Sequence, residues 1–256
     1  MPIAKMNPQR SALRKLCFSQ LRKLNCSYRV WLLGDIEKND TDFEIIKVKG
    51  VSKEDKLREA AKMLEASVVP PAKYLVRLDD DDLINPEVFD AFAKEDFDCC
   101  TDRYHSFYDL SSGKVSSQKR NWFPNTTILR YNHAMQKVPV QGGTALTGKR
   151  NFLIACDHSR AWHLYFADKK VKYTLKNKCL YLRILNPGSI TARKNTHTEY
   201  GEYLSGFGTW SSPFPLKDLS LQEDLKDIWF HENDSFEEYE FPEKGILKRM
   251  IERISK

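Results

Sequence analysis

Four consecutive aspartates, Asp79 to Asp82, follow an apolar segment, Tyr74 to Leu78, that has the pattern of a short buried strand. Pro86 comes next and is followed by apolar residues at helical spacing. We therefore expect the acidic run where a strand leaves a sheet and a helix begins. Four carboxylates this close repel one another, so positive charge must gather around them. A divalent cation held by one or two carboxylates, water and substrate phosphate oxygens fits this pattern, and a solvated acidic turn is the alternative.

The length and composition describe an ordinary globular chain. Its 256 residues suit one large domain, or one domain with a small extension, and 41% of them are hydrophobic. No apolar segment of about 18 residues predicts a membrane span, and the N-terminal residues contain no signal-peptide core, so a cytoplasmic location is expected. The six cysteines form no CxxC pair and are expected to be reduced thiols. The net charge of +6 suits anionic ligands but is too small to indicate nucleic acid.

Helices and strands alternate along the first hundred residues. Helices are expected over 11–24 and 52–66, and strands over 28–33, 43–48 and 74–78. This alternation is typical of an α/β protein with a mostly parallel sheet, in which ligands bind beyond the carboxyl ends of the strands. Asp35 and the acidic run both follow such ends, which indicates one shared site.

The pattern changes after residue 98. Strands over 97–108 and 121–131, with a polar turn at 111–114 between them, predict an antiparallel hairpin, and a helix over 159–167 and a strand over 180–185 follow. We expect a main domain over 1–192, with halves of about 1–98 and 99–192, and an extension over 193–256. Within the extension, the aromatic and glycine-rich segment 200–214 predicts either a mobile lid or a wrapping tail, and is the best candidate for an acceptor-side wall.

The segment Leu78-Asp79-Asp80-Asp81-Asp82, followed by Pro86-Glu87, resembles the L-D-x-D-D…P signature of GT-A glycosyltransferases of the family 2 type. The sequence of residues 76–83 is most similar to that of a bacterial group assigned as rhamnosyltransferases. The resemblance covers about residues 10–190. It implies a GT-A fold, with a Rossmann-like, mixed and mostly parallel central sheet flanked by helices. Only residues 2–6 precede the first helix, so the family's first strand must be very short or missing here.

The resemblance also implies a nucleotide-sugar donor, a Mn²⁺ or Mg²⁺ ion, and roles for individual residues. Asp79 and Asp81 match the two acids of the D-x-D motif, which contact the metal and the nucleotide sugar, and Asp80 is expected beside them as a nucleotide-sugar contact. Asp35 matches the acidic residue that contacts the nucleotide base. Arg58 is a candidate for the family's basic residue near the nucleotide, and a solvated helix arginine is the alternative.

A base is needed to take the proton of the acceptor hydroxyl. The family's Glu-Asp pair is not visible as such, and the nearest candidate is Asp157, which follows an apolar run at 152–154. His158 competes with it, as the base or as an additional metal ligand, because neutral imidazole suits Mn²⁺. The alternative for Asp157 is a helix cap.

The expected function is a metal-dependent, inverting glycosyltransferase that moves a sugar to a glycan or glycolipid acceptor in surface polysaccharide biosynthesis. Two alternatives stay open. One is a metal-dependent nucleotidyltransferase or phosphohydrolase that uses the same carboxylates, and the other is a non-catalytic sugar- or partner-binding module with a degenerate site. Residues 244–256 have the pattern of a basic amphipathic helix, which could contact the inner face of a membrane, or pack on its own domain or in a homodimer.

Overall fold

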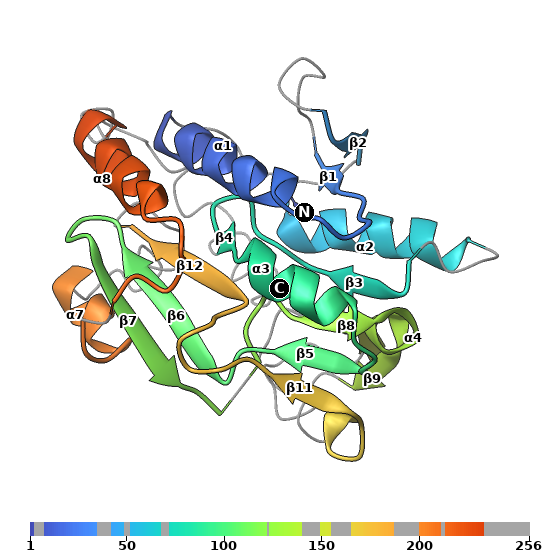
Figure 1. The fold of residues 1–256 in the computed structure, drawn as a ribbon. Helices are drawn as coiled ribbons and strands as arrows, with labels where there is room; N and C mark the ends of the chain where they lie inside the picture. The colour runs from blue at the N-terminus through green and yellow to red at the C-terminus, as the bar shows by residue number, and fades with distance from the viewer. Residues whose placement is uncertain are drawn as a thin grey trace, which may run out of the picture.

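The computed structural model shows an α/β protein, as the sequence predicts (Figure 1). It describes residues 1–2, 8–34, 42–48, 52–67, 72–121, 123–139, 149–154, 165–186, 200–210 and 213–232. Three candidate site residues, Asp35, Asp157 and His158, lie outside these residues, as do most of the helix expected over 159–167 and the whole of 244–256. The described cysteines are all free thiols, as expected.

The helices and strands follow the expected order along the first hundred residues. The helices are α1 (Pro8–Arg22), α2 (Lys53–Glu65), α3 (Pro86–Ala93), α4 (Tyr131–Met135), α7 (Tyr200–Ser205) and α8 (Ser220–Glu232). The strands are β1 (Trp31–Leu33), β2 (Glu44–Ile46), β3 (Tyr74–Val76), β4 (Leu83–Ile84), β5 (Cys99–Thr101), β6 (Tyr104–Asp109), β7 (Lys114–Lys119), β8 (Ile128–Arg130), β9 (Lys137–Pro139), β10 (Lys149–Asn151), β11 (Val171–Tyr173) and β12 (Tyr181–Leu185).

The strands of the described residues form two four-stranded and two two-stranded sheets rather than one central sheet. The four-stranded sheets have the orders β11-β5-β8-β3 and β4-β12-β6-β7. Three of the eight pairings between described strands are parallel and five are antiparallel, so the expectation of a mostly parallel sheet is wrong. The reason lies in β8, which is antiparallel to both of its neighbours, and in short connections that only antiparallel strands allow.

The expected hairpin is present, but its second strand is a different segment. The turn lies at 110–113, where Gly113 has a φ of +67° that favours glycine, and β7 pairs antiparallel with β6. Residues 121–131, the expected partner, contribute β8 to the other sheet, where β8 pairs antiparallel with β5 at the start of the expected strand 97–108. The sequence of β7 contains one apolar residue, Val115, so it lacks the strand pattern and was missed.

Of the residues where the first strand is expected, the structure describes Pro2, which forms a bridge. Pro2 pairs parallel with Leu33 of β1. The amino group of Met1 donates to the carbonyl oxygen of Trp31 at 2.8 Å, and the amide of Leu33 donates to the carbonyl oxygen of Met1 at 2.8 Å. These bonds have the pattern of a parallel ladder.

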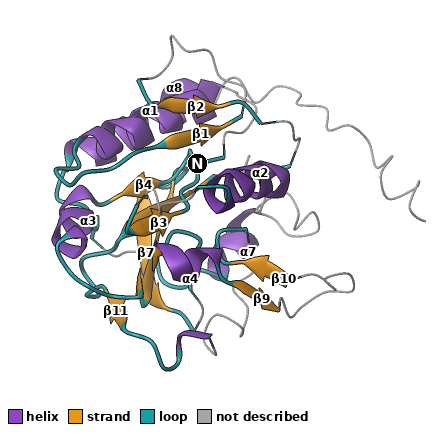
Figure 2. Cartoon of the chain, turned by 90° about the vertical axis from the view of Figure 1, so that its right-hand side faces the viewer, coloured by secondary structure: helices purple, strands orange, loops and turns teal. Residues whose placement is uncertain are grey.

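The described part of the segment beyond residue 192 packs into the rest of the molecule. Helices α1 and α8 lie side by side in Figure 1, and the turned view of Figure 2 shows them together again. Leu13 and Leu21 of α1 share one hydrophobic cluster with Leu221 and Leu225 of α8. Burial of these leucines is therefore what holds α8 against the main domain.

The described part of the aromatic segment wraps onto the β6-β12 face of its sheet. Tyr203 of α7 is buried in a cluster with Phe107 and Leu185. The hydroxyl of Ser116 on β7 donates to the carbonyl oxygen of Phe207 at 2.6 Å. Of the two alternatives left open by the sequence, this packing corresponds to the wrapping tail.

Two glycines of this segment provide a test of its packing. Gly208 has a φ of +90°, and a Cβ built there would lie 1.4 Å from Nε2 of Gln118, whereas a Cβ on Gly201 in α7 would meet no atom within 4 Å. We expect Gly208→Ala to lower the free energy of unfolding by about 1–2 kcal/mol, because alanine is strained at positive φ. Gly201→Ala should be neutral or stabilising by about 0.5–1 kcal/mol. Urea unfolding of both variants checks this, and equal effects would contradict the described packing.

Candidate functional site

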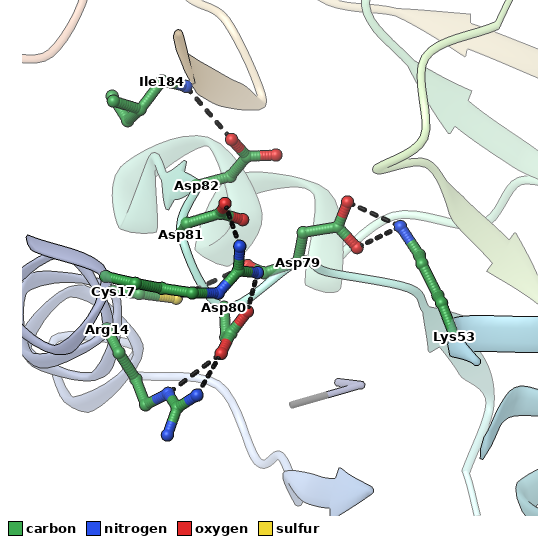
Figure 3. Close-up of polar contacts among 9 residues, drawn as sticks. Arg14, Cys17, Lys53, Asp79, Asp80, Asp81, Asp82 and Ile184 are labelled. Carbon is green, nitrogen blue, oxygen red and sulfur yellow. Dashed lines mark hydrogen bonds and ion pairs between the residues drawn. The ribbon is translucent and has the colours of Figure 1, made fainter. Parts of the chain in front are cut away.

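The acidic run connects the two four-stranded sheets. It follows β3, which is an edge strand of one sheet, and leads directly into β4, which is an edge strand of the other. Helix α3 begins at Pro86, as predicted, but the short strand β4 lies between the run and the helix. The four carboxylates are therefore placed at a junction between sheets, where they point in different directions (Figure 3).

Two alternate carboxylates of the run, those of Asp80 and Asp82, are buried and bonded to the protein. The side chain of Asp80 is 0% exposed, and its Oδ2 accepts from Nε and Nη2 of Arg14 at 2.9 and 2.6 Å. Arg10 adds a contact of 2.5 Å to Oδ1. Oδ1 of Asp82 accepts from the amide of Ile184 on β12 at 3.0 Å (Figure 3). These bonds connect the acidic run to α1 and to the sheet β4-β12-β6-β7.

The structure places Asp80, which the resemblance implied as a nucleotide-sugar contact, away from the surface. Its side chain has no exposed surface, and three nitrogen atoms from two arginines surround its two oxygens. A ligand would have to displace buried ion pairs to reach it, which is unfavourable.

The other two carboxylates, those of Asp79 and Asp81, reach the surface. Their side chains are 21% and 20% exposed. Nζ of Lys53 lies 2.5 and 2.6 Å from the two oxygens of Asp79 (Figure 3), and Nη1 of Arg10 lies 2.9 Å from Oδ2 of Asp81. The accessible pair is the pair that matches the D-x-D motif.

The surroundings push the pKa values of these two carboxyls apart. Burial opposes ionisation of Asp79, but the Lys53 ammonium outweighs it, with a smaller contribution from Arg77, and the pKa of Asp79 is lowered. Burial raises the pKa of Asp81 to about 6, and the neighbouring Asp79 adds to this effect, while Arg10 opposes it. Asp79 is thus a carboxylate at neutral pH, and Asp81 is the more easily protonated of the two.

The positive charge required by the run comes in part from side chains that the sequence analysis did not select. Arg10 and Arg14 lie four residues apart on α1, and Lys53 is the first residue of α2. The sequence pattern could have identified Arg14. It falls on the same helical face as Leu13 and Cys17, which are both buried. An arginine on a buried face needs an acidic partner.

Arg58 does not lie in the site. Its Nη2 contacts Oε1 of Glu54 at 2.5 Å, one turn earlier on α2, and its side chain is 44% exposed. This arrangement corresponds to the alternative of a solvated helix arginine. The basic residue of α2 that reaches the acidic run is Lys53, which points toward Asp79 from the start of the helix.

The two accessible carboxylates fit a hard divalent cation. Carboxylate oxygens are the ligands that Mg²⁺ and Mn²⁺ prefer, and an ion bound together with a phosphate needs only one or two of them from the protein. Among the described residues there is no cluster of three or more His, Cys, Asp or Glu side chains placed to hold a metal. Asp79 and Asp81 would therefore share such an ion with ligand oxygens rather than enclose it.

The segment that leads to the candidate base is tied to the end of β3. Nη1 of Arg77, two residues before the acidic run, donates to the carbonyl oxygen of Leu153 at 3.3 Å, and its Nη2 donates to Oδ1 of Asn125 at 3.0 Å. Asp157 follows Ile154 by three residues, which span at most about 11 Å of extended chain. Asp157 and His158 lie outside the described residues, so their roles stay predictions.

Comparison of the chain with protein-family models, with curated proteins and with solved structures found no match. None of the described helices is long and apolar enough to cross a membrane.

The burial of Asp80 leads to a first test of the site. We expect Asp80→Asn to lower the free energy of unfolding by about 3–5 kcal/mol, because Arg14, 5% exposed, would lose its buried counter-charge. Asp42→Asn is the matched control, since Asp42 pairs with Arg22 at the surface and little change is expected there. Urea unfolding of both variants measures the difference, and a neutral Asp80→Asn would show that the run is not anchored to α1 as described.

Asp81 leads to a test that depends on pH. Its folded pKa of about 6 lies above the value of about 3.9 expected in the unfolded chain. Between pH 4 and 6 the folded state binds more protons, so this group lowers stability as pH rises through that range. We expect Asp81→Asn to raise the free energy of unfolding by on the order of 2 kcal/mol at pH 7 and by much less at pH 4.5. A gain that is the same at both pH values would rule out the raised pKa.

Proposed function

We propose that this chain is a metal-dependent, inverting glycosyltransferase that moves a sugar from a nucleotide-sugar donor to a glycan or glycolipid acceptor. The observation that carries the proposal is the division of the acidic run. Asp80 and Asp82 are buried and bonded within the protein, whereas the side chains of Asp79 and Asp81 are partly exposed. Such a division supports a ligand-binding role for one pair, because a plain acidic turn has no reason to separate its carboxylates in this way.

The cations around the accessible pair also support the proposal. Lys53 and Arg10 are 37% and 24% exposed and contact Asp79 and Asp81. Both side chains can pair with phosphate oxygens, Lys53 as a point charge and Arg10 through its planar group of donors. When a diphosphate binds, they can remain beside it and share its negative charge, while Asp79 and Asp81 hold the metal ion.

Each of these groups would have its own role in the reaction. A bound Mn²⁺ or Mg²⁺ would supply positive charge for the diphosphate as it leaves. Lys53 and Arg10 would hold the phosphate oxygens in place, which orients the sugar for attack from the opposite side. Asp157 or His158 would take the proton of the acceptor hydroxyl.

A calorimetric titration tests the proposal directly. We expect UDP, GDP or dTDP to bind at least tenfold more tightly with Mn²⁺ than without it, because the ion bridges the diphosphate and the two carboxylates. Asp81→Ala should remove this enhancement. Asp168→Ala is the matched control, because Asp168 is 77% exposed on another part of the surface, and it should bind like the unchanged chain.

The same samples separate the remaining alternatives. Release of the nucleoside diphosphate from a nucleotide sugar in the presence of Mn²⁺ supports sugar transfer. Release of pyrophosphate from a nucleoside triphosphate and a sugar phosphate would instead indicate a nucleotidyltransferase. No metal-dependent binding of any of the three nucleotides would contradict the proposal.

A further inference from the structure

A basic surface lies at the end of β11, the strand at the opposite edge of its sheet from β3. The acidic run follows β3, so the two surfaces belong to opposite edges of that sheet. The end of β11 lies next to the start of β6 in Figure 1, and β7 ends beside the same point. Four cations and two other side chains are exposed there, and we call them the basic patch: Arg103, Lys119, Tyr173, Leu175, Lys176 and Lys178.

Ring contacts hold the cations of the patch close together. Cζ of Arg103 lies 4.7 Å from the centroid of the Tyr173 ring, and Nζ of Lys176 lies 5.6 Å from the centroid of the Tyr104 ring. Lys119 is directly opposite Tyr104 in the antiparallel pair of β6 and β7, so their side chains share one face of the sheet. Like charges gathered in this way repel one another, and the ring faces offset only part of that repulsion.

No carboxylate neutralises the patch. Its segments contain no Asp or Glu, and none of its four cations forms an ion pair within the described part of the chain. The preceding Lys169 and Lys172 differ, because they pair with Asp168 at 2.8 Å and with Glu95 at 3.0 Å. The nearby Asp102 is 1% exposed and bonded to the protein. The patch is therefore a surface of uncompensated positive charge that attracts anions.

The connection that carries Leu175 is fixed at both ends by one buried carboxylate. The hydroxyl of Thr174 and the amide of Leu180 both donate to Oδ1 of Asp102, the amide at 2.7 Å. The amide of Lys178 donates to the carbonyl oxygen of Leu175 at 3.0 Å and closes a turn between them. Leu175 is 65% exposed in this turn. The fold thus holds an apolar side chain in water among cations, and that side chain gains free energy when it enters apolar surroundings.

This combination favours a lipid surface over a soluble polyanion. A cation already lies on one face of the Tyr104 ring and of the Tyr173 ring, which hinders stacking of nucleic-acid bases. A soluble polyanion would pair with the four cations but would leave Leu175 in water. An anionic bilayer offers phosphates at its surface and apolar chains directly below them, so it satisfies both kinds of side chain.

We propose that the basic patch binds the surface of an anionic lipid bilayer, with the side chain of Leu175 below the headgroups and the four cations beside the lipid phosphates. The contact is reversible, because one leucine and four cations bind far less strongly than a membrane-spanning helix. Each cation close to such a surface strengthens binding about fivefold. The inference rests on residues other than 244–256 and does not depend on sugar transfer.

Co-sedimentation of the full chain with lipid vesicles tests the proposal. One set of vesicles consists of phosphatidylcholine alone, and the other contains about 30% phosphatidylglycerol. Two variants change the patch. The first combines Lys176→Gln with Lys178→Gln, and the second is Leu175→Ser. All three side chains are exposed, so both variants should fold, and their melting temperatures check this.

Each variant has a matched control. Lys62→Gln combined with Lys217→Gln removes the same charge from two other exposed positions, in α2 and before α8. Leu219→Ser changes a leucine that is also 65% exposed but lies outside the patch.

We expect the chain to bind the anionic vesicles at least tenfold more tightly than the neutral ones. The double lysine variant should weaken this binding about 20-fold and Leu175→Ser about fivefold or more, while the controls change it less than about twofold. Equal binding to both kinds of vesicle would overturn the proposal. Patch variants that bind as the unchanged chain does, or that lose no more than their controls, would also overturn it, because another surface would then contact the bilayer.

Polyuridylate, added as a competitor, separates lipid from nucleic acid. We expect it to bind more weakly than the anionic vesicles. If it binds more tightly, and Leu175→Ser leaves that binding unchanged, the patch recognises a soluble polyanion and the proposal is wrong.

Discussion

The buried ion pair between Arg14 and Asp80 is the interaction on which the rest of the site depends. Four adjacent carboxylates cannot all be ionised in one place unless cations are built in beside them. Arg14 supplies that charge from the buried face of α1, with Arg10 one turn earlier. Arg14 and Arg10 hold the Asp80 side chain inside the protein, whereas the side chains of Asp79 and Asp81, on either side of it in the turn, are 21% and 20% exposed.

The acidic run lies at a junction between two sheets, and this position fixes its carboxylates in place. The run begins where β3 ends and leads into β4, and Asp82 accepts a bond from β12. The accessible carboxylates are therefore held on both sides by strands instead of on a free loop. A rigid pair of carboxylates flanked by Lys53 and Arg10 is suited to a metal ion and a diphosphate together, which is the basis of the proposed sugar transfer.

Several features could be predicted from the sequence because the signal for them is local. The capping box of Ser52 and Asp55 marks the start of α2, and Pro86 marks the start of α3. Other features depend on contacts between distant segments. The polar strand β7 is defined by its pairing with β6, and the order of strands that makes the sheets mixed depends on where β8 inserts. For the same reason, the choice of Lys53 over Arg58 could not be made from spacing alone, since it depends on how the N-terminus of α2 lies against the end of β3.

The central claim is that Asp79 and Asp81 are a metal-binding pair kept accessible by the burial of Asp80 and Asp82. Anomalous X-ray diffraction from crystals soaked with Mn²⁺ and a nucleoside diphosphate tests it most directly. The account predicts one manganese peak within bonding distance of carboxylate oxygens of Asp79 or Asp81, with Asp80 still paired to Arg14. A map with no peak there, and with Lys53 and Arg10 still bonded to Asp79 and Asp81, would contradict it.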